Sequence, residues 1–428
     1  MADRVLVVGA GGREHALVRA LLRSRRRPEL IAAPGNAGIA RDRVECLEVA
    51  ADDVDGIVRT ARDREASLVV VGPEAPLVAG VVDALSDAGI AAFGPSAAAA
   101  RVEGSKTHAK ELMRDVGIPT AGYAVFRDRE EALAHVACAS YPAVLKADVL
   151  AAGKGVIVAQ DEREAREAID EFFVEKRFGQ TEVVIEEFLE GEELSLLALC
   201  DGERALPMAP AQDYKRIHDG DEGPNTGGMG SYSPVPGIDS EHAEVLARAI
   251  HQPLVDELCR RGTPYHGVLY AGLMMTTAGP KVLEYNCRFG DPETQAVLPR
   301  LRSDLLELER STRPGGLAGA PLEWSTEWAV TVVLASRGYP ESSSGGDEIK
   351  GLRSIDSLEA EVLHAGTAEE DGRIVTAGGR VLNVTGFGGT PGEARDRAYS
   401  AAERIHFEGK QMRTDIALRA VERVEVRA

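Results

Sequence analysis

Residues 5–15 read Val5-Leu-Val-Val-Gly-Ala-Gly-Gly-Arg-Glu-His15. The apolar run Val5–Val8 has the length of a strand that is buried on both faces, and the glycines after it favour a tight turn into a helix. The same order recurs over the first hundred residues, with apolar runs at Leu30–Ala33, Leu68–Val71 and Ala91–Phe93 and helical segments at His15–Arg27 and Leu77–Ala88. The pattern predicts an α/β domain with a doubly wound parallel sheet.

Three loops follow strands of this predicted sheet, at Gly9–Gly12, Pro34–Asn36 and Gly72–Glu74. Because ligands of doubly wound sheets bind at the carboxyl ends of the strands, we expect all three loops at one binding edge. A dinucleotide fingerprint would need a third glycine where this chain has Glu14, and an acidic residue at the end of the second strand, where it has Ala33. A small phosphorylated metabolite is therefore favoured over NAD, and a purely structural role of the glycines remains an alternative.

The composition limits the kinds of partner. The chain has 428 residues, with 49 Lys plus Arg against 69 Asp plus Glu and a formal net charge of −20. This balance disfavours nucleic acid and anionic membranes as partners, although a locally basic cleft can still hold phosphates. No apolar run reaches the ~20 residues of a membrane span, no export signal follows Arg4, and the five cysteines show no metal-binding spacing. We therefore expect a soluble, cytoplasmic protein.

The length fits about three domains. We expect a substrate-binding domain at residues 1–104, a central domain at 105–313 and a small α+β domain at 322–428, with a Gly- and Pro-rich boundary at Pro314–Pro321. The central part has predicted helices at Lys106–Val116, Asp161–Phe173 and Glu241–Arg261 and predicted strands at Ala143–Ala147, Val156–Ala159, Glu182–Glu187, Gly267–Thr276 and Val282–Asn286. The last part has strands at Trp328–Leu334 and Arg380–Val384 and a helix at Pro391–His406.

The segment Lys146-Ala-Asp-Val-Leu-Ala-Ala-Gly-Lys-Gly155 joins two of these strands. A loop of small residues can fold over a polyphosphate and present N–H donors, while its two lysines supply positive charge. It lacks the spacing of a P-loop, and a plain hairpin is the alternative. Four of the nine lysines of the chain fall within residues 104–156, namely Lys106, Lys110, Lys146 and Lys154. This concentration favours a nucleotide lid.

The stretch Lys281-Val-Leu-Glu-Tyr-Asn-Cys-Arg288 alternates polar and apolar residues. The period of two puts Val282, Glu284, Asn286 and Arg288 on one face of a strand. Oxygen atoms of Glu and Asn suit Mg²⁺, which neutralises a triphosphate, and Arg288 can clamp a carboxylate or phosphate. The alternative is an exposed polar face. The next residues, Asp291-Pro-Glu293, fit a helix start with Asp291 as N-cap.

Two further polar segments are candidates for binding. The strand Val183–Glu187 leads into a carboxylate-rich turn through Glu193, which can serve an adenine and a ribose or simply be a solvated acidic turn. Asp213-Tyr-Lys-Arg216 and Asn225-Thr-Gly-Gly-Met-Gly230 lie in one long loop, and loops of that length are usually functional or disordered. Lys215 and Arg216 are candidates for anionic substrates, against a solvated pair.

Taken together, these motifs resemble the phosphoribosylamine–glycine ligase family, ATP-grasp enzymes of de novo purine synthesis. The octapeptide Arg-Phe-Gly-Asp-Pro-Glu-Thr-Gln at residues 288–295 is a highly specific signature. The resemblance spans nearly the whole chain, through Gly9–Ala16, Pro34–Gly38, Gly72–Val78, Glu103–Lys106, Lys146–Val156, Gly223–Gly230, His364–Thr367 and Ile405–Gly409.

The resemblance implies a two-part ATP-grasp domain with a lid at about residues 120–190. It also implies a reaction in which ATP phosphorylates glycine to glycyl phosphate and the amine of 5-phosphoribosylamine displaces the phosphate. The products would be glycinamide ribonucleotide, ADP and phosphate. The expected cofactors are ATP, as a substrate, and Mg²⁺ or Mn²⁺, and the expected partners are the two small molecules alone, bound by a monomer.

The resemblance further assigns a role to each matching residue. Arg288, Asp213 and Lys215 would be catalytic, and Glu284 and Asn286 would bind the metal. ATP would contact Lys106, Lys146, Gly153, Lys154, Gly155, Glu186, Glu187, Leu189 and Glu193. The small substrates would contact Gly11, Gly12, Arg13, Glu14, Asn36, Pro73, Glu74, Asn225, Thr226, Gly227, Gly228 and Arg288.

Two residues depart from the family pattern. Val149 stands where the loop usually has glycine, and Tyr214 stands where the family often has histidine. Because a β-branched residue disfavours positive φ, Val149 is expected to stiffen the lid or shift its closure. Three other interpretations remain open: another ATP-grasp ligase or a carboxylase, a nicotinamide-binding oxidoreductase, and a regulatory nucleotide-binding protein without activity.

Overall fold

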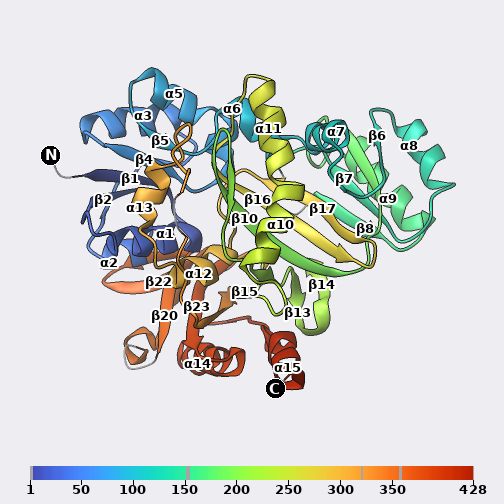
Figure 1. Cartoon of the computed structure of the whole chain (residues 1–428). Helices are drawn as coiled ribbons and strands as arrows, with labels where there is room; N and C mark the ends of the chain where they lie inside the picture. The colour runs from blue at the N-terminus through green and yellow to red at the C-terminus, as the bar shows by residue number, and fades with distance from the viewer. Residues whose placement is uncertain (1–2, 151–154, 320–321, 356–358, 428) are drawn as a thin grey trace.

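The computed structural model describes residues 3–150, 155–319, 322–355 and 359–427. Its amino-terminal part contains five parallel strands in the order β3-β2-β1-β4-β5, on the left of Figure 1. This arrangement confirms the predicted doubly wound sheet. The elements of this part are β1 (Arg4–Gly9), α1 (Gly12–Leu22), β2 (Glu29–Pro34), α2 (Ala37–Arg41), β3 (Glu45–Cys46), α3 (Val54–Asp63), β4 (Leu68–Val71), α4 (Glu74–Val78), α5 (Val81–Asp87), β5 (Ala92–Phe93) and α6 (Ala97–Gly104).

The three predicted binding loops meet at one edge of this sheet. Gly9 lies opposite Pro34 in the β1–β2 register, and the Gly72 N–H donates to the carbonyl of Val8 at 3.0 Å. The helix predicted at Leu77–Ala88 is instead two helices, α4 and α5. Gly80 separates them with φ of 90°, a left-handed conformation that interrupts a helix and that glycine adopts without strain.

The central part contains two four-stranded sheets. The sheet with the shorter strands has the order β6-β9-β7-β8 and packs with α8 and α9 at the right of Figure 1. The sheet with the longer strands has the order β11-β10-β16-β17. Their elements are α7 (Lys106–Val116), β6 (Tyr123–Phe126), α8 (Arg129–Val136), β7 (Ala143–Ala147), β8 (Val156–Ala159), α9 (Glu162–Phe173), β9 (Val183–Glu187), β10 (Glu192–Asp201), β11 (Ala205–Pro207), α10 (Ser240–Ile250), α11 (Gln252–Arg260), β16 (His266–Thr276), β17 (Gly279–Asn286), α12 (Glu293–Val297) and α13 (Leu305–Arg310).

The predicted bounds of α7, β7 and β8 are confirmed. The helix predicted at Glu241–Arg261 is two helices, α10 and α11, with Pro253 in the first turn of the second. Proline has no N–H for a helical hydrogen bond, so it fits the start of a helix and disfavours the middle.

The carboxy-terminal sheet uses strands from both sides of the Pro314–Pro321 segment. Its order is β12-β15-β18-β23-β20, so two strands of the 212–233 region pair into it. The remaining elements are β12 (Gln212–Asp213), β13 (Arg216–His218), β14 (Glu222–Asn225), β15 (Gly230–Ser233), β18 (Trp328–Ala335), β19 (Gly345–Glu348), β20 (Ala360–His364), β21 (Thr367–Glu370), β22 (Arg373–Ala377), β23 (Arg380–Gly388), α14 (Pro391–Arg404) and α15 (Leu418–Arg427).

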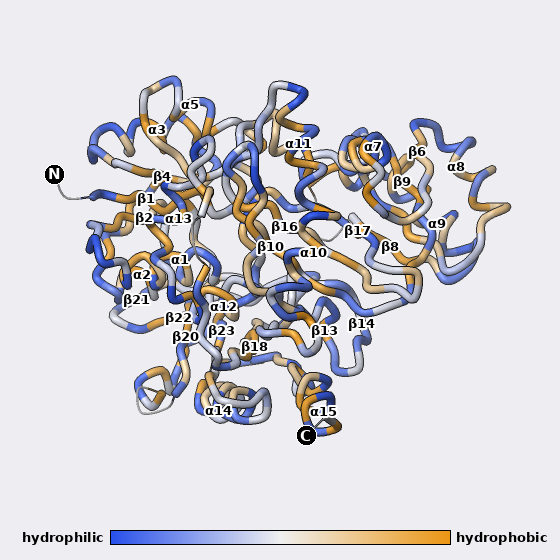
Figure 2. The backbone as a smooth tube through the Cα atoms, viewed as in Figure 1, coloured by the Kyte–Doolittle hydropathy of each residue, from blue (hydrophilic) through white to orange (hydrophobic). Residues whose placement is uncertain are grey.

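One continuous hydrophobic cluster joins the three parts. It includes Leu6 of β1, Tyr285 of β17 and Val384 of β23, which are at most 3% exposed. Figure 2 shows hydrophobic residues along inner strands such as β10 and β16 and hydrophilic residues on the outer turns. The parts therefore share buried surface, which stabilises the walls of the space between them.

The close packing of α14 on β23 is tested by Gly386→Ala. An added Cβ would come within 2.3 Å of both the Ala394 carbonyl oxygen and the Ala398 nitrogen, which are backbone atoms that cannot rotate away. We expect the variant to lose about 1 to 3 kcal/mol of unfolding free energy in urea denaturation. Gly345→Ala is the matched control, because its Cβ would meet only an ordinary contact at 3.5 Å. Equal stability of the two variants would contradict this packing.

Candidate functional site

A cavity of about 680 Å³ opens between the amino-terminal loops, the two central sheets and the start of β23. It contains most of the residues to which the sequence analysis gave a role. Those that line it are Arg13, Pro73, Glu74, Lys106, Lys146, Gly155, Glu186, Glu187, Leu189, Glu193, Asp213, Lys215, Asn225, Thr226, Gly227, Glu284, Asn286 and Arg288. Gly153 and Lys154 lie outside the described residues. Segments separated by more than two hundred residues in sequence thus meet in one cleft.

Two lysines share one carboxylate on the lid side of this cleft. Glu186 of β9 lies 2.9 Å from Lys110 of α7 and 2.9 Å from Lys146 of β7, and all three side chains are at most 9% exposed. Burial lowers the pKa of Lys110 to about 8, although the nearby Glu186 acts in the opposite direction. At neutral pH the trio therefore keeps a net positive charge that suits an anionic ligand. Lys110 had no assigned role, and only the clustering of lysines in sequence pointed to it.

Lys106 connects the start of α7 to the loop after β7. Its Nζ donates to the Val149 carbonyl at 2.8 Å, and Asp148 accepts from the Ser105 hydroxyl at 2.9 Å and from Thr107 N–H at 3.1 Å. Val149 is not among the residues with positive φ, so a β-branched side chain fits this backbone without the strain considered from the sequence. The expected effect of Val149 on lid closure stays a prediction.

The hinge after β9 carries a second set of charge contacts. Glu187 accepts from Lys281 at 2.8 Å and from the Gly122 N–H at 3.0 Å, and Leu189 is buried with 8% exposure. Glu193 of β10 lies 2.9 Å from Lys215. The hinge thus combines a buried leucine with carboxylates, and its contact with a nucleoside stays a prediction.

Glu284 and Asn286 present oxygen atoms from β17. The Glu284 side chain is 42% exposed and lies 3.9 Å from Lys215, whereas the Asn286 Oδ1 accepts from Arg288 at 3.0 Å. Partial burial in the cleft would raise the pKa of Glu284, but Lys215 and Lys146 outweigh it and lower the pKa, so the group is an anion. Such oxygen donors fit Mg²⁺ or Mn²⁺.

The predicted row of side chains on this strand needs one correction. Val282 is fully buried in the core and does not share the cleft face with Glu284. A register shift opposite Gly272 and Leu273 inserts an extra residue into β17, which reverses the alternation at that point. No group of three or more His, Cys, Asp or Glu able to hold an ion occurs in the described part of the chain.

Asp213 lies in a network of acidic and hydroxyl groups. The Ser195 hydroxyl is 3.5 Å from Asp213 and 3.1 Å from Glu293, and it also contacts the Tyr270 hydroxyl at 3.0 Å. Burial raises the pKa of Asp213 to about 8, with Lys215 opposing and Glu293 adding to the rise. For Lys215 burial acts to lower the pKa, but Glu193 and Asp213 outweigh it and raise the pKa well above its ordinary value. A cation thus lies beside a carboxyl group that titrates near neutrality.

Arg288 joins the end of β17 to the amino-terminal domain. Its guanidinium lies 3.0 Å from Glu74 and 3.4 Å from Glu103, and Glu103 also accepts from the Cys287 N–H at 2.7 Å. Burial would raise the pKa of Glu74, but Arg288 and Arg13 lower it to about 2. Burial raises the pKa of Glu103. Arg288 is therefore held between two carboxyl groups, with its charge facing the cleft.

Several predicted substrate residues do not line the cavity as the described residues define it: Gly11, Gly12, Glu14, Asn36 and Gly228. Asn36 caps α2 through the Gly38 and Ile39 N–H groups and donates to the carbonyls of Ala10 and His364 at 2.8 and 2.9 Å. These four bonds use its whole hydrogen-bonding capacity. Glu14 accepts from the Gly11 N–H at 2.6 Å. Both side chains hold loops together, and their substrate roles stay predictions.

The helix start predicted at Asp291 is displaced by one residue. Pro292 is the N-cap of α12, whereas the Asp291 carboxylate accepts from Gln295 at 2.6 Å and pairs with Arg380 at 3.1 Å. Arg380 of β23 also lines the cleft, and the sequence analysis missed it. Arg380 lies in a predicted strand of the last domain, and nothing in that part of the sequence indicates a contact with the signature octapeptide.

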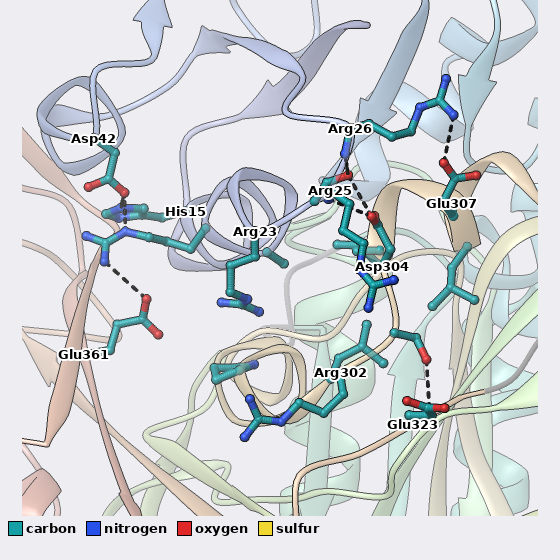
Figure 3. Close-up of a pocket in the computed structure, with 18 of the residues that line it drawn as sticks. His15, Arg23, Arg25, Arg26, Asp42, Arg302, Asp304, Glu307, Glu323 and Glu361 are labelled. Carbon is teal, nitrogen blue, oxygen red and sulfur yellow. Dashed lines mark hydrogen bonds and ion pairs between the residues drawn. The ribbon is translucent and has the colours of Figure 1, made fainter.

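A larger cavity of about 1210 Å³ lies between α1, residues 299–308 and β20 (Figure 3). Six arginines and six carboxylates line it, and pairs such as Arg26 with Glu307 at 3.0 Å and Arg19 with Glu361 at 3.4 Å neutralise one another. The formal charges of its lining residues therefore cancel.

Comparisons with known proteins show the family of the chain. Three models of phosphoribosylglycinamide synthetase match consecutive parts of the chain, the N domain at residues 3–103, the ATP-grasp (A) domain at 104–294 and the C domain at 329–419. The chain belongs to the phosphoribosylglycinamide synthetase family.

Relatives within this family cover nearly the whole chain. The phosphoribosylamine–glycine ligase of Streptomyces coelicolor is 51% identical over 97% of this chain and 99% of its own length. The trifunctional purine biosynthetic protein adenosine-3 of Gallus gallus is 48% identical over 98% of this chain and 42% of its own length. The synthetase family therefore includes both single-function and larger chains of this sequence type.

Solved structures support the same fold. The crystal structure of phosphoribosylamine–glycine ligase from Thermotoga maritima is 37% identical, covers 97% of this chain and 100% of that one, and has a TM-score of 0.83. The biotin carboxylase domain of 2-oxoglutarate carboxylase from Hydrogenobacter thermophilus is 18% identical over 96% of this chain and 91% of that one, with a TM-score of 0.70. The second likeness concerns the fold alone. Within the described residues of this synthetase-family chain, none of the helices has the length and apolar character to span a membrane.

The contact between Glu74 and Arg288 predicts an acid-dependent stability. The folded-state pKa of Glu74, about 2, lies below the ordinary 4.5, so its carboxylate stabilises the folded chain fully above about pH 4.5 and loses this effect as the pH falls toward 2. We expect Glu74→Gln to lower the unfolding free energy by about 2 kcal/mol at pH 7, and we expect the difference from the parent to shrink below pH 4.5.

Urea denaturation at several pH values measures this difference. Glu65→Gln is the control, because Glu65 is 84% exposed and lies 3.7 Å from Arg4, a contact expected to contribute little. A constant difference between Glu74→Gln and the parent from pH 7 to pH 3 would contradict the interpretation.

Proposed function

We propose that this chain ligates glycine to 5-phosphoribosylamine with ATP and releases glycinamide ribonucleotide, ADP and phosphate. The observation that carries this proposal is the 51% identity to a phosphoribosylamine–glycine ligase over nearly the full length of both chains. The cleft supports it, because its cationic and carboxylate groups suit two phosphorylated substrates and an amino acid. The expected setting is the step of de novo purine synthesis that this reaction performs.

In this proposal ATP binds on the lid side of the cleft. Lys106 and Lys146 contact its phosphates, together with Gly153, Lys154 and Gly155 of the loop between β7 and β8. The hinge residues Glu186, Glu187, Leu189 and Glu193 contact the adenine and ribose. We add Lys110 to this set as a positioning residue, since it shares the Glu186 carboxylate with Lys146 at equal distance.

Glu284 and Asn286 are the proposed ligands of Mg²⁺ or Mn²⁺, with the ATP phosphates completing the shell. When bound, the ion neutralises phosphate charge and polarises the phosphoryl group that is transferred. Glu284 suits this task because nearby cations lower its pKa and keep it ionised. Lys215 lies 3.9 Å from this carboxylate and is one of these cations.

The glycine carboxylate needs activation, since a carboxylate is a poor electrophile. ATP transfers its terminal phosphoryl group to the carboxylate oxygen and gives glycyl phosphate and ADP. Arg288 and Lys215 hold the glycine carboxylate in line with the phosphoryl group and stabilise its spreading charge. The ion pairs from Arg288 to Glu74 and Glu103 fix its direction. This step uses positioning and electrostatics, and no protein nucleophile.

The amine of 5-phosphoribosylamine then attacks the acyl carbon and expels phosphate. Its phosphoribosyl group binds near the amino-terminal loops, with Arg13, Pro73, Glu74 and the glycines Gly11 and Gly12. Asp213 in its ionised form accepts the proton that the amine loses, and with a pKa of about 8 this form is the minor one at pH 7. The lid excludes water from the acyl phosphate. We expect the enzyme to act in the cytoplasm as a monomer.

The decisive experiment measures ADP release with each substrate left out in turn. We expect ADP only when ATP, a divalent ion, glycine and 5-phosphoribosylamine are all present, and we expect mass spectrometry to detect glycinamide ribonucleotide. Bicarbonate in place of glycine is the control suggested by the carboxylase fold likeness. Turnover with bicarbonate and none with glycine would overturn the proposal.

The metal assignment is tested by Glu284→Gln. We expect turnover to fall about 100-fold or more at limiting Mg²⁺, with partial recovery at high Mg²⁺, because the amide lacks the charge that holds the ion. Thermal denaturation should change little, since the side chain faces the cleft. Glu408→Gln is the matched control on the exposed surface of the last domain. Unchanged turnover at limiting Mg²⁺ would remove Glu284 from the ligand set.

A further inference from the structure

One segment of the cleft begins and ends in the carboxy-terminal sheet. We call residues 213–228 the cleft loop. Its first residue, Asp213, ends β12, which pairs with β15, and β15 pairs in turn with β18. Asp213, Lys215 and the run 225–227 of this loop all line the cavity. The place of these groups therefore depends on the last domain, although they precede it by about a hundred residues in sequence.

Arg413 anchors the first half of the cleft loop. Its side chain is fully buried and donates to the Asp415 carboxylate at 2.6 and 2.7 Å and to Asp221 at 2.9 Å. It also donates to the backbone carbonyl of Arg216 at 3.1 Å, and its guanidinium lies 4.8 Å from the centre of the Tyr214 ring. A buried cation with this many partners fixes the loop backbone on the carboxy-terminal segment.

Tyr214 carries the effect of this anchor to the cleft. Its side chain is 5% exposed, and its hydroxyl accepts from the Ala417 N–H at 3.0 Å. Because successive residues of an extended segment point to opposite sides, turning Tyr214 into the last domain directs Asp213 and Lys215 toward the cleft. This contact is also a structural role for Tyr214, which stands where the family often has histidine.

Arg380 anchors the second half of the loop. Its guanidinium donates to the carbonyls of Gly227 and Asp291 at 2.6 and 2.8 Å, and it pairs with the Asp291 carboxylate at 3.1 Å. The Tyr339 hydroxyl accepts from the Gly227 N–H at 2.9 Å. The N–H and the carbonyl of Gly227 thus both form hydrogen bonds with residues of the last domain. The same arginine joins the loop to the signature octapeptide.

We propose that Arg413 and Arg380 are positioning residues through which the carboxy-terminal domain holds the cleft loop in the geometry that ligation needs. The inference rests on the proposed function. Lys106, Lys146 and Glu186 come from the lid side and do not contact these anchors, and Lys215 links the cleft loop to the ATP side through Glu193 and Glu284. We therefore expect displacement of the loop to weaken the handling of glycine and 5-phosphoribosylamine more than that of ATP. A shift of about 1 Å in such a site can lower turnover about 100-fold.

The experiment compares Arg380→Ala, Arg380→Lys and Tyr214→Phe with the parent enzyme. We expect Arg380→Ala to raise the KM for glycine or lower kcat by about 10- to 100-fold, with the KM for ATP changed less than about twofold. Arg380→Lys should recover part of the loss, because it keeps the charge but not the fork that reaches two carbonyls. Tyr214→Phe removes one hydroxyl without emptying the core, so it should remain folded.

Arg397→Ala is the matched control, because it removes another arginine of the carboxy-terminal domain. Arg397 of α14 donates to the Phe387 carbonyl and pairs with Glu359, and it does not contact the cleft loop. We expect its KM values to stay at the parent level. Equal rises in the KM for ATP and for glycine, or an equal loss in Arg397→Ala, would overturn the proposal.

Hydrogen–deuterium exchange separates this inference from the proposed function. Peptides of residues 214–228 should exchange faster in Arg380→Ala and Tyr214→Phe than in the parent, while peptides of α14 should not. Unchanged exchange in the cleft loop would contradict the proposal that these contacts hold the loop in place, whatever reaction the parent catalyses. A parent enzyme that releases no glycine-dependent ADP would instead overturn the proposed function.

Discussion

The contact of Arg288 with Glu74 and Glu103 is the constraint on which the cleft depends. It joins the end of β17 to α4 and α6 of the amino-terminal domain at 3.0 and 3.4 Å. Removing charges from water costs free energy, which good geometry and further hydrogen bonds must offset. The Cys287 N–H bond to Glu103 is one of these. The amino-terminal loops and the signature octapeptide must therefore stay together for the charges to remain paired.

The same reasoning explains how an acidic protein can bind anions. The chain carries a net charge of −20, yet Lys110 and Lys146 share the single carboxylate of Glu186 inside the cleft. Local excess of cations over carboxylates sets the potential felt by a phosphate, because burial reduces screening by water.

Local patterns predicted much of the fold. The apolar run Val5–Val8, the glycines after it and the bounds of α7, β7 and β8 follow from strand length, side-chain period and turn residues, which act between neighbours in sequence. Long-range pairing was not predictable in this way. The bulge that buries Val282 depends on Gly272 and Leu273 of another strand. The break between α4 and α5 was readable in principle from Gly80, but an isolated glycine does not always end a helix.

The sequence by itself determined the amino-terminal sheet, the family and a set of site residues most of which line the cleft, because these depend on residue types at short, regular spacing. Only the tertiary structure decided what each polar group contacts. In the structure, Asn36 makes four hydrogen bonds that hold loops together. Asp291, predicted as a helix cap, pairs with Arg380, and Lys110 joins Lys146 and Glu186 on the lid side of the cleft. Spacing along the chain gives the direction of a side chain, whereas its partners come from segments brought near by packing of the whole core.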